Sequence, residues 1–139
     1  MHLAEGFLAT LAVREDAITQ DALLDLATAL QKRFIDRQHG VMMEKPLGAV
    51  DNWFEPGHQF EWFFLLDSSE VLRGTPLHAS LTRAFAYAEL KGVDKLSGAV
   101  SGMLALDGSV RDGTQRIWAQ AEYLSLIHIS EPTRQEAIS

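Results

Sequence analysis

The stretch that most constrains the fold is Glu55-Pro56-Gly57-His58-Gln59-Phe60-Glu61-Trp62. Proline is favoured at the first position of a helix, because its missing N–H would have no partner there anyway. The apolar block that follows, residues 60–66, extends this segment, so we expect a helix over about residues 55–72. His58 and Glu61 are three residues apart and would share one face of its first turns.

Helices are also expected on either side of this segment. Apolar residues recur at helical spacing, so the predicted helices cover residues 1–14, 20–38, 55–72 and 75–92, and a fifth begins near Thr114. Gly40 stands where the second helix would need a left-handed C-cap, and Thr75 caps the fourth helix. Strand is expected only in a hairpin over residues 98–113 and at residues 41–43.

Composition narrows the class of protein. The net charge of −7 argues against a nucleic-acid partner, because phosphate binding needs clustered Lys and Arg. The absence of cysteine excludes disulfides and thiolate metal sites. No apolar run approaches the roughly 18 residues of a membrane span, and no leader peptide opens the chain. We therefore expect a cytoplasmic protein without membrane or nucleic-acid partners.

The last residues, 124–139, differ in character from the rest. Leu124-Ser125-Leu126-Ile127-His128-Ile129-Ser130-Glu131-Pro132-Thr133-Arg134 resembles the in-frame translation of a sequencing-library adapter, and the final five residues fit an index and the constant adapter sequence after it. Such a segment is set aside before the fold is considered. The expected division is a native domain at 1–123 and a non-native tail at 124–139, which would cut the fifth helix; a native amphiphilic C-terminus is the alternative.

His58 and Glu61 are the first candidates for chemistry. A carboxylate beside an imidazole fixes its tautomer and raises its basicity, which suits removal of a proton next to a carbonyl. The same spacing also occurs in ordinary surface ion pairs, so both interpretations stay open at this point. A metal site is not expected, because no third ligand stands nearby in the sequence.

Other residues have two possible uses. Trp118 and Glu122 share a helix face, and the indoles of Trp53, Trp62 and Trp118 could stack on sugar rings or simply fill the core. His2 alone would ordinarily be a solvated or packing residue. Paired helices with little strand suggest an α-solenoid or a toroid of helical hairpins, although no fixed-period repeat is visible in the sequence.

Three ordered segments resemble the N-acylglucosamine 2-epimerase family. They are Met1-His2-Leu3-Ala4-Glu5, the stretch from Glu55 to Trp62, and Arg116-Ile117-Trp118-Ala119-Gln120-Ala121-Glu122. The resemblance spans residues 1–123. It implies an all-α fold, with this chain forming about the middle third of an (α/α)6 barrel and a short β-hairpin in a loop.

The resemblance also implies an activity and roles. The family interconverts aldoses and ketoses, or epimerises sugars at C2, through a cis-enediolate and without a metal or redox cofactor. His58 would be the general acid–base and Glu61 its partner, while His2, Trp118 and Glu122 would contact a mannose- or glucosamine-type sugar. Phe64 replaces a tryptophan of the family motif and would keep an aromatic wall.

Two departures and two alternatives accompany this expectation. Ala119 replaces a proline of isomerase-like members, and the family's second acid–base histidine and upstream arginine are absent, so the chain alone is expected to be inactive. One alternative is an (α/α)6 glycoside hydrolase that uses carboxylates such as Asp51, Glu55 and Asp67. The other is a non-catalytic helical binding module with an exposed apolar edge.

Overall fold

The computed structural model describes the backbone of residues 1–138 and the side chains of residues 1–127. Its elements, in chain order, are α1 (His2–Val13), α2 (Ala17–Arg33), α3 (Pro56–Asp67), α4 (Pro76–Gly92), β1 (Met103–Leu104), β2 (Val110–Asp112) and α5 (Ile117–Ile138). The chain is therefore all-α apart from one small antiparallel hairpin. This agrees with the fold class predicted for a segment of an α-barrel.

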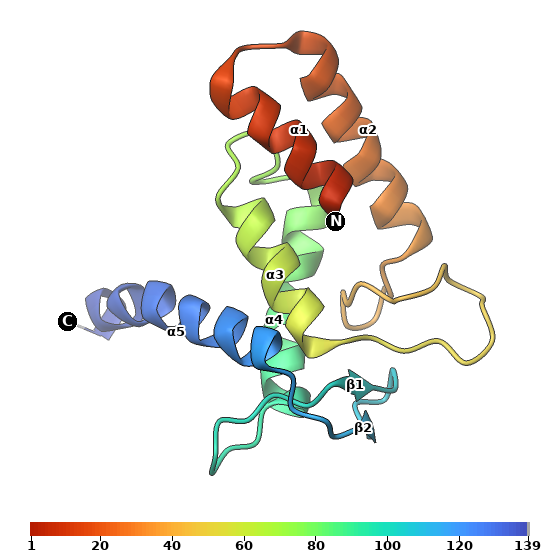
Figure 1. The fold of residues 1–139 in the computed structure, drawn as a ribbon, viewed down its shortest axis with the longest axis vertical. Helices are drawn as coiled ribbons and strands as arrows, with labels where there is room; N and C mark the ends of the chain where they lie inside the picture. The colour runs from red at the N-terminus through yellow and green to blue at the C-terminus, as the bar shows by residue number, and fades with distance from the viewer. Residues whose placement is uncertain (139) are drawn as a thin grey trace.

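The helices are arranged as neighbouring pairs (Figure 1). α1 packs on α2, α2 on α4, and α3 on both α4 and α5. The β1–β2 hairpin lies beyond the end of α4 and is attached to the loop before α3 by a bridge between Phe54 and Leu104. Each helix thus buries its apolar face against the helices that pack on it.

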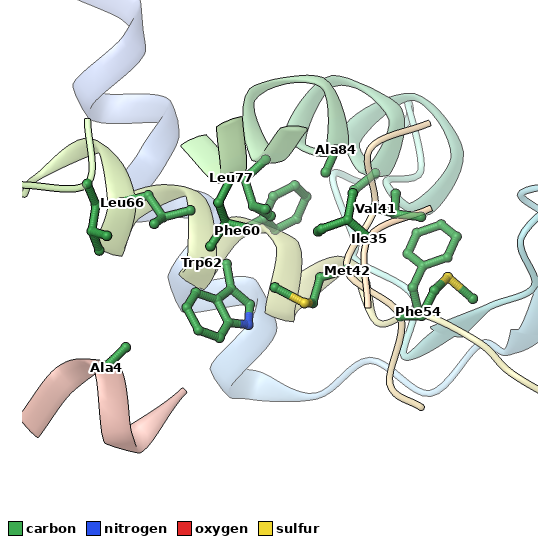
Figure 2. Close-up of a cluster of buried hydrophobic side chains, with 14 of the residues drawn as sticks. Ala4, Ile35, Val41, Met42, Phe54, Phe60, Trp62, Leu66, Leu77 and Ala84 are labelled. Carbon is green, nitrogen blue, oxygen red and sulfur yellow. The ribbon is translucent and has the colours of Figure 1, made fainter. Parts of the chain in front are cut away.

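The core is a continuous cluster between α3 and the helices on both sides of it (Figure 2). Phe60 is fully buried, and its ring lies 5.3 Å from that of Phe85 on α4 and 5.0 Å from that of Tyr123 on α5. Trp62 is also buried, next to the pocket that α1 borders. The apolar block of α3 therefore holds three helices together, and this fixes the position of the residues at its start.

Most predicted helices are confirmed, with shifted ends. α4 begins at its Thr75 cap, whose hydroxyl accepts the N–H of His78, and ends at Gly92 as expected. α2 begins earlier than predicted, because the Asp16 carboxylate caps it by accepting the N–H groups of Ile18 and Thr19. The hairpin over residues 98–113 is confirmed, with its turn at Gly108, which has φ +88°.

Three sequence-based predictions are wrong in detail. α2 ends at Arg33, so Gly40 is not its C-cap but the positive-φ residue of a turn between the bridged residues Ile35 and Met42. α3 ends at Asp67 rather than near residue 72. α5 is not cut at residue 124 but continues as a helix to Ile138, with Leu126 buried. Most of the predicted adapter-derived segment, residues 128–139, has side chains outside the described part, and its origin stays a prediction.

The structure contains a repeated unit that inspection of the sequence did not find. α2 and α4 each have 17 residues, and each is followed by a turn of the same form. In the first turn the N–H of Gly40 donates to the carbonyl of Asp36 over 2.8 Å; in the second, Gly98 donates to Asp94 over the same distance. The two glycines have φ +75° and +73°.

The residues that flank these turns correspond as well. Ile35 forms a bridge with Met42, and Val93 forms a bridge with Val100. The side-chain amide of Gln59 then binds the backbone N–H and C=O of Met42, at 2.8 and 2.9 Å. Gln120 binds Val100 in the same way, at 2.8 and 2.9 Å. Two copies of a helix–turn–helix unit therefore follow one another, and each inner helix, α3 or α5, is fastened to its own loop.

Candidate functional site

The predicted site residues come from the early turns of three helices. His2 stands at the start of α1, His58 and Glu61 in the first two turns of α3, and Trp118 and Glu122 in the first two turns of α5. The repeat places α3 and α5 in equivalent positions, so the starts of these two helices meet on one side of the molecule. The start of α1 joins the start of α3 at a pocket lined by His2, His58 and Glu61. Figure 1 shows the starts of α3 and α5 next to each other.

His58 is held by a carboxylate that the sequence-based reasoning missed. Its Nδ1 lies 2.6 Å from Oε1 of Glu44, and 3.7 Å from Oε2 of Glu55. Glu44 belongs to the loop between α2 and α3, fourteen positions before His58. The pairing of His58 with Glu61 was therefore wrong as a hydrogen bond, since none joins these two residues in the described part of the chain.

The charges around His58 alter its acidity. Burial, the largest single influence, lowers the pKa of His58, but the hydrogen bond to Glu44 and the negative charges of Glu44, Glu55 and Glu61 outweigh it. The net result is a raised pKa, so the imidazole holds a proton more readily than in water. Glu61 thus acts on His58 through its charge, without direct contact.

Glu61 lies among charged groups from all three helices. Burial is the largest cause of its raised pKa, and the negative charges of Glu122 and Glu5 add to it. The imidazoles of His58 and His2 oppose this shift. His2, His58 and Glu61 line one pocket, and Glu122 acts on Glu61 through its charge.

Trp118 lies against His58, and Gly57 makes this possible. The two rings have centroids 5.1 Å apart and planes tilted by 31°. A Cβ at residue 57 would meet ring atoms of Trp118 and the Cβ of Ala119 at 2.8 Å, closer than real Cβ contacts. The glycine before His58 therefore allows α5 to approach α3 and places an indole beside the imidazole.

A pocket of about 370 Å³ opens beside this cluster. Its polar lining consists of His2, Glu44, His58 and Glu61, and its apolar lining of Met1, Leu30, Phe34, Met42, Met43 and Trp62. A pocket with apolar walls and a few convergent polar groups is typical of a small-molecule site. A second groove of about 550 Å³, between α2 and the start of α4, contains neither a histidine nor a carboxylate.

Glu44, Glu55 and His58 could in principle reach one cation. One ligand atom from each lies within 4.8 Å of the others, and imidazole with carboxylates is a donor set that several divalent metals accept. The short contact between Glu44 and His58 already uses Nδ1 of His58 and Oε1 of Glu44, which leaves Nε2 and the second carboxylate oxygen outside it. As arranged, His58 and Glu44 share a hydrogen bond, and Glu55 lies 3.7 Å from the same nitrogen.

A family model for N-acylglucosamine 2-epimerase matches residues 1–137 of this sequence. The chain belongs to the N-acylglucosamine 2-epimerase family. It is also 34% identical, over 134 residues, to a protein of Rhizobium meliloti (strain 1021) named mannose-6-phosphate isomerase. The match covers 89% of this chain and 35% of that protein, so the chain spans about a third of the relative's length.

The residues predicted to contact the substrate differ in how close they lie to the pocket. The side chain of His2 is 96% exposed at the edge of the pocket, and its Nδ1 is 2.7 Å from Glu5. Neither Trp118 nor Glu122 is among the residues that line the pocket, but the ring of Trp118 contacts that of His58, and the charge of Glu122 acts on Glu61. Phe64 is 44% exposed, in the third turn of α3, and is not among the residues that line the pocket.

The other aromatic and acidic candidates have structural surroundings. Trp53 lies under the ammonium of Lys45 and near Arg111, where it connects the loop to the hairpin. Asp67 accepts from His78 at the other end of α3 from Glu55, roughly 18 Å away for a helix of twelve residues. An inverting carboxylate pair stands about 6.5–9.5 Å apart, so Glu55 and Asp67 do not form one. In the described part of the chain, no helix combines the length and the apolar character needed to cross a bilayer.

Proposed function

We propose that this chain provides the acid–base part of an active site that isomerises or 2-epimerises a mannose- or glucosamine-type sugar. The observation that carries the proposal is the imidazole of His58, held by Glu44 between carboxylates at the wall of a pocket and beside the indole of Trp118. Family membership supports the class of reaction. Because the chain spans a third of its relative, the activity is proposed for a protein that contains this segment.

The chemistry follows from the acidity of a proton next to a carbonyl. In the opened sugar, His58 removes the proton from C2, and the electron pair moves to give a cis-enediolate across C1 and C2. Return of the proton to C1, with loss of the O2 proton to O1, gives the ketose. Delivery of a proton to the opposite face of C2 gives the epimer. Carbon C1 is reduced as C2 is oxidised, so the net reaction needs no external oxidant.

The remaining residues have roles that fit their positions. Trp118 would stack on the apolar face of the sugar chain, and Glu61, Glu122 and His2 would accept or donate hydrogen bonds to its hydroxyls. We give Phe64 no contact with the sugar in this proposal. A cytoplasmic location and the inactivity of the chain alone stay predictions, the second testable by assay of the 139 residues with mannose.

A chimera tests the proposal directly. Residues 1–123 would replace the matching third of the Rhizobium meliloti relative, and turnover of mannose and of mannose 6-phosphate would be followed by NMR in deuterated water. We expect isomerisation with solvent deuterium at the reacting carbon, and a loss of about 10²–10⁴-fold in His58→Gln, the usual contribution of a general acid–base. His78→Gln is the matched control, since His78 contacts Asp67 away from the pocket. An active chimera that is indifferent to His58→Gln would refute the proposal.

A further inference from the structure

We infer that Glu44 is the positioning residue of this site: its carboxylate fixes the ring orientation and tautomer of His58 and leaves Nε2 as the atom that exchanges the proton. The inference rests on the proposed function for the role of His58. The placement of Glu44 itself rests on geometry alone. It assigns to a loop residue the task that helical spacing had assigned to Glu61.

The contact between the two side chains determines the tautomer. An ionised carboxylate can only accept hydrogen bonds, so Nδ1 of His58 must carry a hydrogen to donate across the 2.6 Å to Glu44. In the neutral ring the lone pair is then on Nε2. Glu55, at 3.7 Å from the same nitrogen, strengthens the preference for a hydrogen at this position.

The backbone on both sides of Glu44 is fixed. Gln59, one residue after His58, binds both backbone groups of Met42, and it is completely buried. The N–H of Met43 donates to Phe34, and the N–H of Glu44 donates to the carbonyl of Trp53, each over 2.9 Å. The helix that carries the imidazole therefore also holds the loop that carries its carboxylate, and the pair stays aligned.

The second repeat unit shows that a loop can be fastened to its helix by a glutamine without a pair like His58 and Glu44. There Gln120 binds Val100 with the same geometry, yet the residue before Gln120 is Ala119 and the residue two after Val100 is Gly102. These are the positions that His58 and Glu44 occupy in the first unit. The loop therefore closes equally well without an imidazole and a carboxylate, and the pair is an addition to the scaffold rather than a part of what closes it.

The division between the two acids follows from these contacts. Glu44 and Glu55 face Nδ1, whereas Glu61 lines the pocket, makes no hydrogen bond within the described residues and interacts with Glu122, Glu5, His58 and His2 through charge. Glu61 is thus available to sugar hydroxyls, while Glu44 is engaged with the ring. Removing Glu44 should disturb the tautomer and the orientation of the imidazole, whereas removing Glu61 should leave both unchanged.

The test is a pH titration of the histidine side chains in the ¹⁵N-labelled 139-residue chain, because ¹⁵N shifts distinguish the two tautomers. In the unaltered chain we expect the hydrogen on Nδ1 of neutral His58. In Glu44→Ala this preference should be lost and the pKa of His58 should fall. Glu44→Gln keeps an acceptor but removes the charge, so the tautomer should persist while the pKa falls.

Glu61→Gln is the matched control, which should lower the pKa of His58 without altering its tautomer. Hydrogen exchange at the Met42 amide verifies that the loop stays closed; if Glu44→Ala opens it, Glu44→Gln decides the result. An unchanged tautomer and pKa in both Glu44 variants would overturn the inference. The ¹⁵N shifts and the pKa of His58 do not depend on turnover. A chimera whose activity is unchanged by His58→Gln would therefore refute the proposed function and leave the inference about Glu44 intact.

Discussion

Gln59 on α3 and Gln120 on α5 make the same pair of hydrogen bonds, each with both backbone groups of a single loop residue. The two loops would otherwise leave an N–H and a C=O without partners below the surface, which is costly. A glutamine side chain has one donor and one acceptor at the right separation to satisfy both. The loop before each inner helix is therefore fixed by the helix that it precedes.

Replacing Gln59 with leucine should destabilise the protein by roughly 2–4 kcal/mol, because two buried backbone groups lose their partners. Gln120→Leu should cost about half as much, since Gln120 is only partly buried. Urea unfolding measures both, and hydrogen exchange at Met42 and Val100 reports which loop opens. Gln38→Leu, on an exposed turn, is the control and should change stability little. Equal effects at positions 38 and 59 would contradict the account.

Gly57 and Gly6 give opposite predictions for the same substitution. Alanine at 57 would meet Trp118 and Ala119, so Gly57→Ala should cost about 1–3 kcal/mol and move the indole away from His58. Gly6 lies within α1 with open space around it, and Gly6→Ala should stabilise by about 0.5–1 kcal/mol. Thermal unfolding with tryptophan fluorescence compares the two. A neutral Gly57→Ala would show that α5 can shift without loss.

The sequence predicted the parts of this structure that depend on local signals. Thr75 and Pro76 placed the start of α4 correctly, because a cap and a first-turn proline act within a few residues. Gly40 was misassigned because a positive-φ glycine serves a helix end or a turn equally well. The repeat was missed because its shared positions are few, and because the segments that follow the two turns differ in length, so no fixed period results.

The sequence likewise predicted the site residues that lie on a helix, but not the one that lies on a loop. His58 and Glu61 were found through their spacing on one helix, and the structure places both at the pocket. Spacing rules apply only within a regular element, however, and Glu44 is on an irregular loop fourteen positions earlier. Only the folded loop, held by Gln59, brings that carboxylate to Nδ1. The sole advance signal was an acidic residue just after the apolar stretch of residues 41–43.

The raised pKa of His58 predicts how stability changes with pH. A group that binds its proton more tightly in the folded state stabilises the fold fully below its unfolded pKa, near 6.5, and this contribution is lost as the pH rises through the folded value. The stability difference between the unaltered chain and His58→Gln should therefore be largest near pH 5–6, on the order of 1 kcal/mol, and shrink above neutrality. Urea unfolding from pH 5 to 9 measures it. A difference that grows with pH would contradict the sign.

Glu61 should make the stability of the fold depend on pH, and Glu61→Gln should remove this dependence. Its pKa is raised by burial and by the charges of Glu122 and Glu5, so the ionised side chain weakens the fold as the pH rises above about 4.5. Glu61→Gln should therefore be at least as stable as the unaltered chain at pH 7, and this advantage should disappear below pH 4. Glu70→Gln, at an exposed position beyond α3, is the control and should show no such crossover. The same urea series carries the comparison, and a destabilised Glu61→Gln at pH 7 would mean that its attraction to His58 dominates.

Of the three tryptophans, Trp53 is expected to be structural and Trp118 to meet the sugar, while Trp62 belongs to the core and also lines the pocket. Trp53 has a buried indole N–H without an acceptor among the described residues, so Trp53→Phe removes an unsatisfied donor while it weakens the contact with Lys45. The two effects oppose each other, and the net change should be below about 1 kcal/mol. Trp62→Phe, in the core, should cost about 1–3 kcal/mol through lost packing. Trp53→Phe should not alter the KM for sugar in the chimera, whereas Trp118→Phe should raise KM and Trp118→Ala should raise it further. If the Trp53 and Trp118 variants changed KM equally, neither the sugar nor its reacting carbon would lie beside His58.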